Sequence, residues 1–507
     1  MSVLTDHPHI ENSKDAYSYD ITEIGPFEKS SFTSPNSSHN HKQGLDKRPP
    51  LEYRATETDE IAFEHHDTSE EEEIGSISNF EVEESISELG PLSFTNPPGN
   101  LHRVITACIW VFTLGCSDGS VGVLLNYIEE QYNISYSISS LLWLSNAVGY
   151  IIVAALASKI QTHLGRKSTT IGCIFSIVMY SLVSSGSKFP VIVLGFFFGG
   201  IGVGICVSQF NVFVSRLEKS STALGYFHGC YGLGASVSPL MATAFVEAGI
   251  KWHYYYVILI GLMIFNTGNT YYAFIRKGDE LIPWDMAEST NSTNVTVERG
   301  LMKEAIKNKL TWMTSFFVLF YQGAEVAVGG WITTYFRDFR QHKEASVGYI
   351  ASGYWFGITF GRLVLTRLIH KLIGARRGNS LLAVSAIVFL LLTWLVPSLP
   401  LEILTITLAG ISIGPIYPLL MTYVVSEGLL PRKIQIVSLT ITTAFGSSGG
   451  AVFPFFVGLI SQFAGTFVVF PSSIALFSAT LVLWLSMPNT KYRNIGQTKL
   501  ERLKHIW

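Results

Sequence analysis

The sequence predicts an all-α membrane protein in which twelve transmembrane helices form two pseudo-symmetric bundles of six helices each. Apolar runs of about 20 residues recur from residue 103 to residue 487, and each is long enough to cross a bilayer. A charged connector, residues 276–310, divides these runs into six and six. Similar residues also recur in the two halves at nearly constant spacing, which indicates an internal repeat.

The chain begins with a polar segment, residues 1–100, which has 21 acidic and six basic residues. Its apolar residues are too few to form a core, so we expect a disordered acidic tail. We see no basic start leading into a short apolar core and a small-residue cleavage site, so we expect this tail to stay in the cytosol. The stretch from Thr68 to Ser87 is interpreted either as a phosphorylation or trafficking segment or as a passive solvated tail.

Twelve apolar segments follow the tail. We predict an N-terminal six-helix bundle at 101–275, a cytosolic linker at 276–310, a C-terminal six-helix bundle at 311–487 and a cytosolic C-terminal tail at 488–507. The predicted spans are 103–128, 137–158, 168–187, 190–214, 222–248, 252–275, 311–336, 346–369, 379–397, 400–424, 434–463 and 465–487.

Basic residues gather in the loops on one side of the predicted helices. With the amino terminus inside, the inner loops carry most of the Lys and Arg residues. Because basic loops stay on the cytosolic side of a membrane, we expect both termini in the cytosol. The sequence leaves open whether the protein lies in the plasma membrane or in an endomembrane such as that of the vacuole or the Golgi.

Repeated residues relate the two predicted bundles. Gly149 recurs at Gly357, an offset of 208 residues, and the block 234–239, GASVSP, resembles 449–454, GGAVFP, at an offset of 215. Near-constant offsets indicate two parallel halves related by an axis along the membrane normal. Transporters built in this way bind their solute near the midplane, between the halves.

Two carboxylates lie in the middle of predicted membrane helices, Asp118 in the first and Glu325 in the seventh. An ionised side chain at mid-membrane costs roughly 2.5–3.5 kcal/mol, so such residues usually line a polar path or carry protons. We therefore predict that both are proton-coupling residues. The alternative is a neutral carboxyl group whose hydrogen bonds are satisfied by a neighbouring helix.

Polar and aromatic side chains suited to a polar solute occur in the same helices. Each one alone is better explained by helix packing, but together they favour a polar cavity over a dry core. The candidate solute-binding residues are Glu325, Gln322, Trp331, Asn146, Gln209, Asn211, Asn266, Asn269, Tyr354, Trp355 and Tyr417.

Arg362 lies deep enough in the eighth predicted helix to need a partner. It is interpreted either as a gate or counter-ion to a carboxylate, or as a side chain that reaches the cytosolic surface. The sequence has no phosphate-binding G-x-x-x-x-G-K-[ST] motif, which argues against nucleotide hydrolysis as an energy source. The five cysteines show no metal-ligand spacing, so we expect no cofactor and no metal.

The loop Gly165-Arg166-Lys167 after the second predicted helix resembles the signature of the major facilitator superfamily, as does the twelve-helix repeat. The segment 323–331, GAEVAVGGW, and Asp118-Gly119-Ser120 resemble the fucose-permease-like branch, which includes proton-coupled sugar symporters and sodium-dependent glucose carriers. The resemblance covers about residues 100–490, and the long acidic tail is similar to that of fungal members.

This resemblance implies that Asp118 matches the proton-coupling acid of the first helix and that Glu325 matches the acid of the seventh-helix motif. It also implies that Gly165, Arg166 and Lys167 belong to the gate. Where the bacterial fucose permease has an acid four residues before Asn211, this chain has Val207, so fucose specificity is not implied.

These observations together predict a secondary active transporter, and not an enzyme, that moves a small polar solute such as a sugar with protons by alternating access. A facilitative uniporter and a transport-like nutrient sensor that signals through its tail are the alternatives. We expect a monomer in contact with membrane lipid and no nucleic-acid partner.

Overall fold

The computed structural model describes residues 90–282, 295–342 and 344–489, and these ranges contain helices and no strand. All the described residues belong to one compact unit. The predicted disordered tail up to residue 89, residues 283–294 of the predicted linker, and the predicted C-terminal tail from residue 490 lie outside the described residues.

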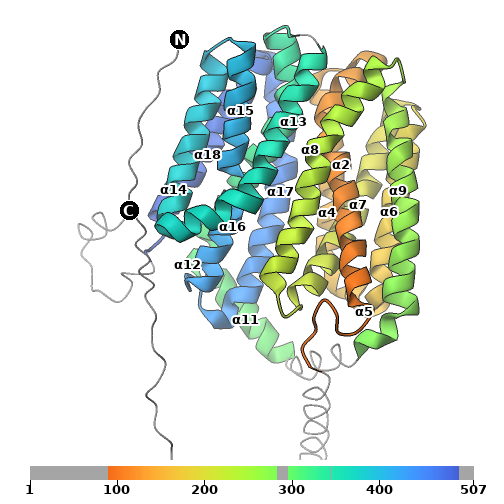
Figure 1. Cartoon of the computed structure of the whole chain (residues 1–507), viewed down its shortest axis with the longest axis vertical. Coiled ribbons are helices and arrows are strands. Elements are labelled where there is room, and N and C mark those ends of the chain that lie inside the picture. Colours follow the sequence, from red (N-terminus) through yellow and green to blue (C-terminus); the bar gives the residue numbers. More distant parts are fainter. Residues whose placement is uncertain (1–89, 283–294, 343, 490–507) are drawn as a thin grey trace, which may run out of the picture. The chain divides into compact units, whose positions relative to one another are not determined.

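The helices of the first half follow one another with short turns between them (Figure 1). They are α2 (Asn100–Tyr132), α3 (Tyr136–Ser139), α4 (Leu141–Ala155), α5 (Ala157–Leu164), α6 (Ser168–Ser184), α7 (Phe189–Ser215), α8 (Ser220–Glu247) and α9 (Tyr255–Thr270). The second half contains α11 (Val295–Lys307), α12 (Lys309–Thr334), α13 (Glu344–Phe360), α14 (Thr366–Leu395), α15 (Leu399–Ile413), α16 (Ile416–Met421), α17 (Arg432–Ala464) and α18 (Val469–Ser486).

Eleven helical stretches of the described residues are long and apolar enough to cross a membrane, and together they overlap all twelve predicted spans. The stretch Val347–Leu395 is 49 residues long and contains the predicted eighth and ninth helices. Gly374 separates these two helices, because its backbone has φ 80° and ψ 167° and so leaves the helical range. Glycine adopts such a positive φ without a side-chain clash.

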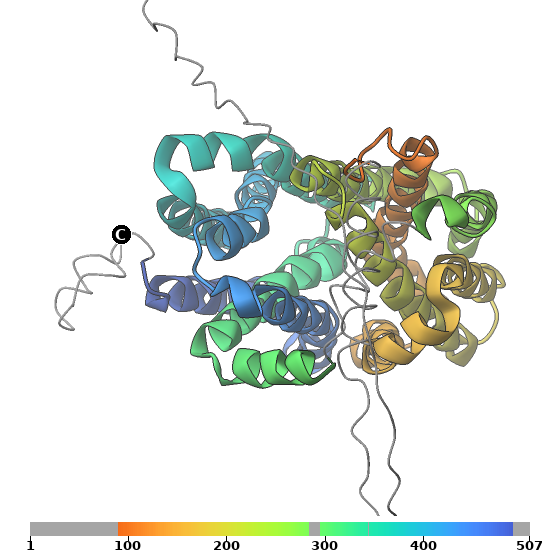
Figure 2. The same ribbon diagram turned by 90° about the horizontal axis from the view of Figure 1, so that it is seen from below.

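The two halves repeat the same helix neighbours, which confirms the predicted pseudo-symmetric fold. In the first half α2 packs on α8, α4 on α7, and α6 on α9; in the second, α12 packs on α17, α13 on α15, and α14 on α18. Figure 2 shows the two groups of helices side by side.

The glycine pair that suggested the repeat has one structural role in both halves. A Cβ atom on Gly149 would lie 2.2 Å from the carbonyl oxygen of Phe197, and a Cβ on Gly357 would lie 2.3 Å from that of Thr407. Only glycine permits these backbones to come so close, as is common between membrane helices. The repeated glycines therefore fix the α4–α7 and α13–α15 crossings.

The bundle has two ends, which we name by their contents. The connector end carries the start of α2, the turn η1 (Gly165–Lys167), the turn η4 (Gly278–Leu281) and α11, at the bottom of Figure 1. The far end carries the end of α2, α3 and the turn η5 (Tyr335–Phe339).

The described part of the predicted tail packs onto the connector end. Leu92 is buried, and its carbonyl oxygen accepts a 2.8 Å hydrogen bond from the backbone N–H of Glu218. Nearby, the buried Arg103 donates to Glu280 at 2.9 Å and so joins α2 to η4. Residues 90–99, which composition assigned to the tail, therefore include residues that pack on the bundle.

Candidate functional site

The two mid-helix carboxylates lie at nearly the same depth on helices that touch. Asp118 lies 118 − 100 = 18 residues after the start of α2, and Glu325 lies 325 − 309 = 16 residues after the start of α12. At about 1.5 Å of rise per residue, these positions differ by roughly 3 Å. Since α2 packs on α12, the first helices of the two halves bring both acids to the boundary between the halves.

Asp118 lies among the helices, and its side chain is exposed in this structure. The hydroxyl of Tyr231 on α8 donates a 3.1 Å hydrogen bond to Asp118 Oδ2. Within the described residues no Lys, Arg or His forms an ion pair with this carboxylate. Tyr231 also interacts electrostatically with Glu325 and Arg362, so it lies near both acids.

Glu325 has different surroundings, because it is buried and paired. The residue is 5% exposed, and Arg362 Nη2 lies 2.6 Å from Oε1 and 2.8 Å from Oε2. The Tyr321 hydroxyl donates to Oε2 as well. The Tyr354 hydroxyl donates a 2.9 Å hydrogen bond to the backbone carbonyl of Glu325, which fixes this turn of α12. Arg362 is thus the counter-ion of Glu325, and its guanidinium is held in the bundle.

Of the predicted solute-binding residues, Tyr417 lies beside this ion pair, and Gln322 lies three residues before Glu325 on α12. The Tyr417 ring stacks 6.4 Å from the Tyr321 ring, and Tyr417 interacts electrostatically with Arg362. Gln322 packs against Gly446 of α17. Both side chains are half-buried, so they can contact a molecule that reaches the ion pair.

Four other predicted residues are buried in this conformation. Trp331 donates from Nε1 to the carbonyl oxygen of Pro454 at 2.8 Å, and its ring lies 5.4 Å from that of Trp143 in the first half. Tyr354 and Trp355 are also buried, as is Asn266 in α9, whose amide atoms have no hydrogen-bond partner in the described chain. Trp331 therefore packs one half against the other here and does not face solvent.

The remaining predicted polar residues belong to the first half. Gln209 donates to Gln161 at 2.8 Å, and Asn211 donates to the carbonyl of Val207, one turn earlier in α7, at 2.9 Å. Asn146 and Asn269 are half-buried on α4 and α9. The structure thus gathers Asp118, Glu325, Arg362 and Tyr417 near the boundary between the halves, while Gln322 packs on α17. Gln209 and Asn211 form their hydrogen bonds within the first half.

The predicted gating loop contacts the start of the connector. Gly165 has φ 46° and ψ −126°, a backbone conformation that favours glycine and turns the chain sharply after α5. This turn brings Arg166 Nη1 to 3.8 Å from Asp279 Oδ1 in η4. Lys167 ends η1, directly before α6, and is exposed.

Comparison with known proteins settles the family of this fold and site. The sequence profile of the Major Facilitator Superfamily matches residues 107–454. The chain belongs to this superfamily. Among the relatives of this facilitator, Bypass of stop codon protein 6 of Saccharomyces cerevisiae is 26% identical over 402 residues, which covers 74% of this chain and 80% of the yeast protein. The Glucose/mannose transporter GlcP of Bacillus subtilis is 24% identical over 357 residues, 68% of this chain and 85% of GlcP.

Solved structures of other transporters share the facilitator fold. A D-xylose-proton symporter matches with a TM-score of 0.59 at 14% identity, over 78% of this chain and 99% of that one. The nucleoside transporter NupG matches with a TM-score of 0.57 at 11% identity, over 76% of this chain and 99% of that one. These likenesses show the fold. The chain is therefore a multi-pass membrane transporter, in agreement with the prediction that it is not an enzyme.

Two tyrosines of this facilitator's site were not among the sequence-predicted residues. Tyr321 lies four residues before Glu325, a spacing that places both side chains on one face of a helix, and this spacing is a usable signal. Tyr231 lies on α8, far from Asp118 in sequence, and nothing in the spacing of the chain pairs the two.

Proposed function

We propose that this transporter moves a small polar solute of the sugar class together with protons, by alternating access between its two halves. The observation that carries the proposal is that Asp118 and Glu325, which lie at nearly the same depth, have different surroundings. Asp118 is exposed and lacks a counter-ion in the described chain, whereas Glu325 is buried and paired with Arg362. A coupling group must exchange protons with water, and Asp118 has the surroundings for that exchange.

The proposed proton cycle follows from the cost of burying charge. Moving the halves to close over Asp118 removes its carboxylate from water, which costs several kcal/mol if the group is ionised and unpaired. A bound proton removes most of this cost. Closure around the neutral acid is then favoured, and re-exposure on the other side of the membrane releases the proton. Tyr231 orients the carboxylate through its hydrogen bond and links it to the charges of the second half.

The proposed solute contacts centre on Arg362. Glu325 lies beneath it and is almost fully buried, while the Arg362 side chain is 17% exposed. Glu325 thus contributes to binding by holding the guanidinium of Arg362 in place. Arg362 offers N–H donors to the solute, Gln322 offers an amide, and Tyr417 offers an aromatic ring. Such groups bind the hydroxyls and the apolar faces of a sugar.

The sugar class is supported by one relative in sequence and by one solved structure with the same fold. The bacterial relative is named a glucose/mannose transporter, and a structure with the same fold is a D-xylose-proton symporter. Both are named for monosaccharides, and the second is also named for protons.

The proposed orientation places the connector end in the cytosol, with both termini on that side. It is supported by exposed basic residues at this end, such as Lys159, Lys219, Lys371 and Lys433. Protease digestion of sealed vesicles tests it, because an epitope inserted after Asn291 is then cleaved only from the cytosolic side. Cleavage from the other side would reverse the orientation.

The test of the proposed function is uptake by the purified full-length protein in proteoliposomes. The panel contains hexoses, pentoses, polyols and nucleosides, each measured with and without an inward proton gradient and a protonophore. We expect accumulation of a monosaccharide above the equilibrium level, and its loss when the protonophore collapses the gradient. Downhill flux that ignores the gradient would identify a uniporter, and binding without flux would identify a sensor.

A further inference from the structure

The far end of the bundle holds a second titratable site that neither the carboxylates at mid-depth nor the proposed solute site uses. Glu129, near the end of α2, is 7% exposed, and its Oε1 accepts a 2.6 Å hydrogen bond from Ser139. Its Oε2 has no hydrogen-bond partner in the described chain and lies 3.9 Å from Arg337 of the second half.

Arg337 forms its closest ion pair with another carboxylate, that of Asp338. Its Nε lies 2.6 Å from Asp338 Oδ1, and its Nη2 lies 3.3 Å from Asp338 Oδ2. Asp338 Oδ2 also accepts a 2.6 Å hydrogen bond from Tyr136 of the first half. The negative charge of Asp338 is therefore well compensated. Glu129 makes only the longer, 3.9 Å contact with the same guanidinium.

This cluster lies where the two halves are packed together. One turn beyond Asp118, a Cβ atom on Gly122 would lie 2.6 Å from the carbonyl oxygen of Gly329. Further along, the Thr334 hydroxyl donates a 2.9 Å hydrogen bond to Asn126 Oδ1 across the boundary. The far end is thus closed in this structure, and Glu129, Arg337, Asp338 and Tyr136 are part of the closed contact.

The charges of the cluster do not balance. Arg337 and Asp338 are the charged groups of the described chain that act on Glu129. Two carboxylates and one guanidinium leave one negative charge in excess, and the side-chain exposures of Glu129, Arg337 and Asp338 are 7%, 26% and 24%. A buried carboxylate without full compensation is costly, whereas one bound proton makes the cluster neutral.

We propose that Glu129 is a second proton-binding site, and that proton binding there stabilises the closed far end. The proton enters from the water that reaches Arg337 and Asp338, and it leaves when the halves separate and Glu129 becomes hydrated. Acid at the far side therefore favours closure. This site does not rest on the proposed role of Asp118 or on the identity of the solute.

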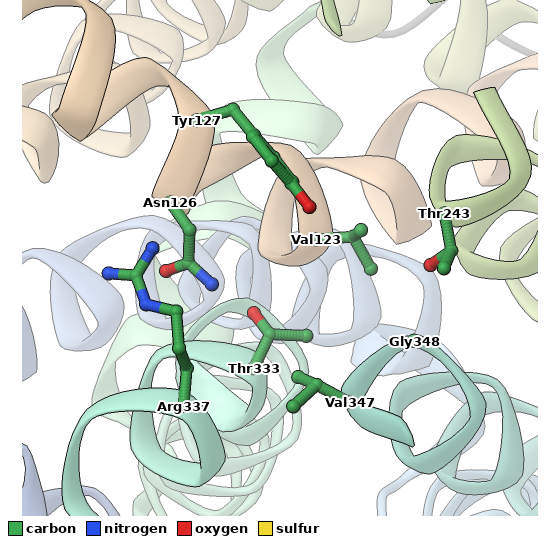
Figure 3. Close-up of a pocket in the computed structure, with 8 residues that line it drawn as sticks. All are labelled: Val123, Asn126, Tyr127, Thr243, Thr333, Arg337, Val347 and Gly348. Atoms are coloured by element: carbon green, nitrogen blue, oxygen red, sulfur yellow. The ribbon is translucent and has the colours of Figure 1, made fainter. Parts of the chain in front are cut away.

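A small pocket lies beside Arg337 of the cluster. Figure 3 shows Asn126 and Arg337 facing each other across the boundary, with Thr243 on the opposite wall. Thr243 Oγ1 is buried and has no hydrogen-bond partner within the described residues, so the pocket has a free polar group for an ordered water. A water in this pocket would lie beside Arg337, the guanidinium that Glu129 and Asp338 share.

The test measures the far-end separation of the halves as a function of pH. Nitroxide labels are placed at Ser187 in the first half and Leu395 in the second, both exposed, in a full-length variant whose five native cysteines are replaced by alanine. This background must first show the solute binding of the unaltered protein. Pulsed electron paramagnetic resonance then gives the ratio of short to long distances between the two labels, in solute-free protein between pH 5 and pH 8.

We expect the short-distance population to grow as the pH falls, because one linked proton changes the ratio by up to about tenfold per pH unit. Glu129→Gln, which copies the neutral acid, is expected to hold the short distance at every pH. Glu129→Ala, which also loses the Ser139 bond, serves as the control for a merely structural role. Asp118→Asn is expected to keep the far-end response.

The proposal is overturned if Glu129→Gln keeps the pH response of the labelled background, or if Asp118→Asn abolishes it. A background whose distances ignore pH overturns it as well. If Glu129→Gln opens the far end as Glu129→Ala does, the residue acts through its charge on Arg337 and not by binding a proton, and the proposal also fails.

Discussion

The ion pair between Glu325 and Arg362 leads to an asymmetric prediction about stability. Arg362→Gln leaves Glu325, which is 5% exposed, with the Tyr321 hydroxyl as its remaining side-chain donor. Breaking a buried ion pair by removing one partner typically costs about 3–5 kcal/mol. Glu325→Gln instead leaves Arg362, which is 17% exposed and can be hydrated, so we expect a loss nearer about 1–3 kcal/mol.

The double variant separates the pair from its surroundings. Replacing both residues by glutamine removes both charges, so its loss of stability should be smaller than the sum of the two single losses by about 2 kcal/mol or more. The loss in Arg362→Gln should also depend on pH. Its unpaired carboxyl group is tolerated when neutral and costly when ionised, so the variant should be less stable at pH 8 than at pH 5.5.

The assay is unfolding of the purified protein in detergent micelles, followed by tryptophan fluorescence at both pH values. Gln435→Ala, a half-buried residue of α17 near the connector end, serves as a matched polar-to-apolar control. If Arg362→Gln unfolds like the unaltered protein at pH 8, or if the two single losses simply add, then the pair does not hold the site together and the reasoning fails.

Three further predictions concern transport. Glu325→Gln should weaken solute binding by about 1–3 kcal/mol, measured by isothermal titration, because the guanidinium loses its anchor; unchanged affinity would leave Glu325 a purely structural role. Tyr231→Phe should keep solute binding but move the pH profile of uptake to higher pH, since it removes the hydrogen bond that stabilises ionised Asp118; an unmoved profile would separate Tyr231 from coupling. Deleting residues 1–89 should leave flux per folded molecule unchanged in proteoliposomes, and a loss of flux there would make the tail part of the mechanism.

The fold was predictable because its signals are local. Apolar runs of about 20 residues need no tertiary information, and a bilayer requires each one to be a helix. The repeat was predictable too, because close helix crossings accept only small residues, as at Gly149 and Gly357. Spacing alone did not reveal that the single residue Gly374 separates the eighth and ninth helices.

The site was predictable in part. Asp118 and Glu325 stand out because ionisable residues are rare at mid-membrane, and the structure brings both to the boundary between the halves. Their partners depend on the tertiary arrangement of helices far apart in sequence, as in the pairing of Tyr231 with Asp118. Glu129 looked like an ordinary helix-end acid, because nothing in the local sequence reveals that α3 and η5 cover it. Trp331 looked like a solute contact, and its position next to Trp143 became visible only once the halves were packed together.

The central claim is that Asp118 carries the coupled proton, and one comparison tests it most directly. The unaltered protein and Asp118→Asn are reconstituted in proteoliposomes, and each is assayed for solute counterflow and for accumulation driven by an inward proton gradient. The amide copies the neutral acid but cannot release a proton. We predict that Asp118→Asn keeps counterflow at a rate similar to that of the unaltered protein and loses accumulation. Accumulation by Asp118→Asn to the level of the unaltered protein would contradict the claim.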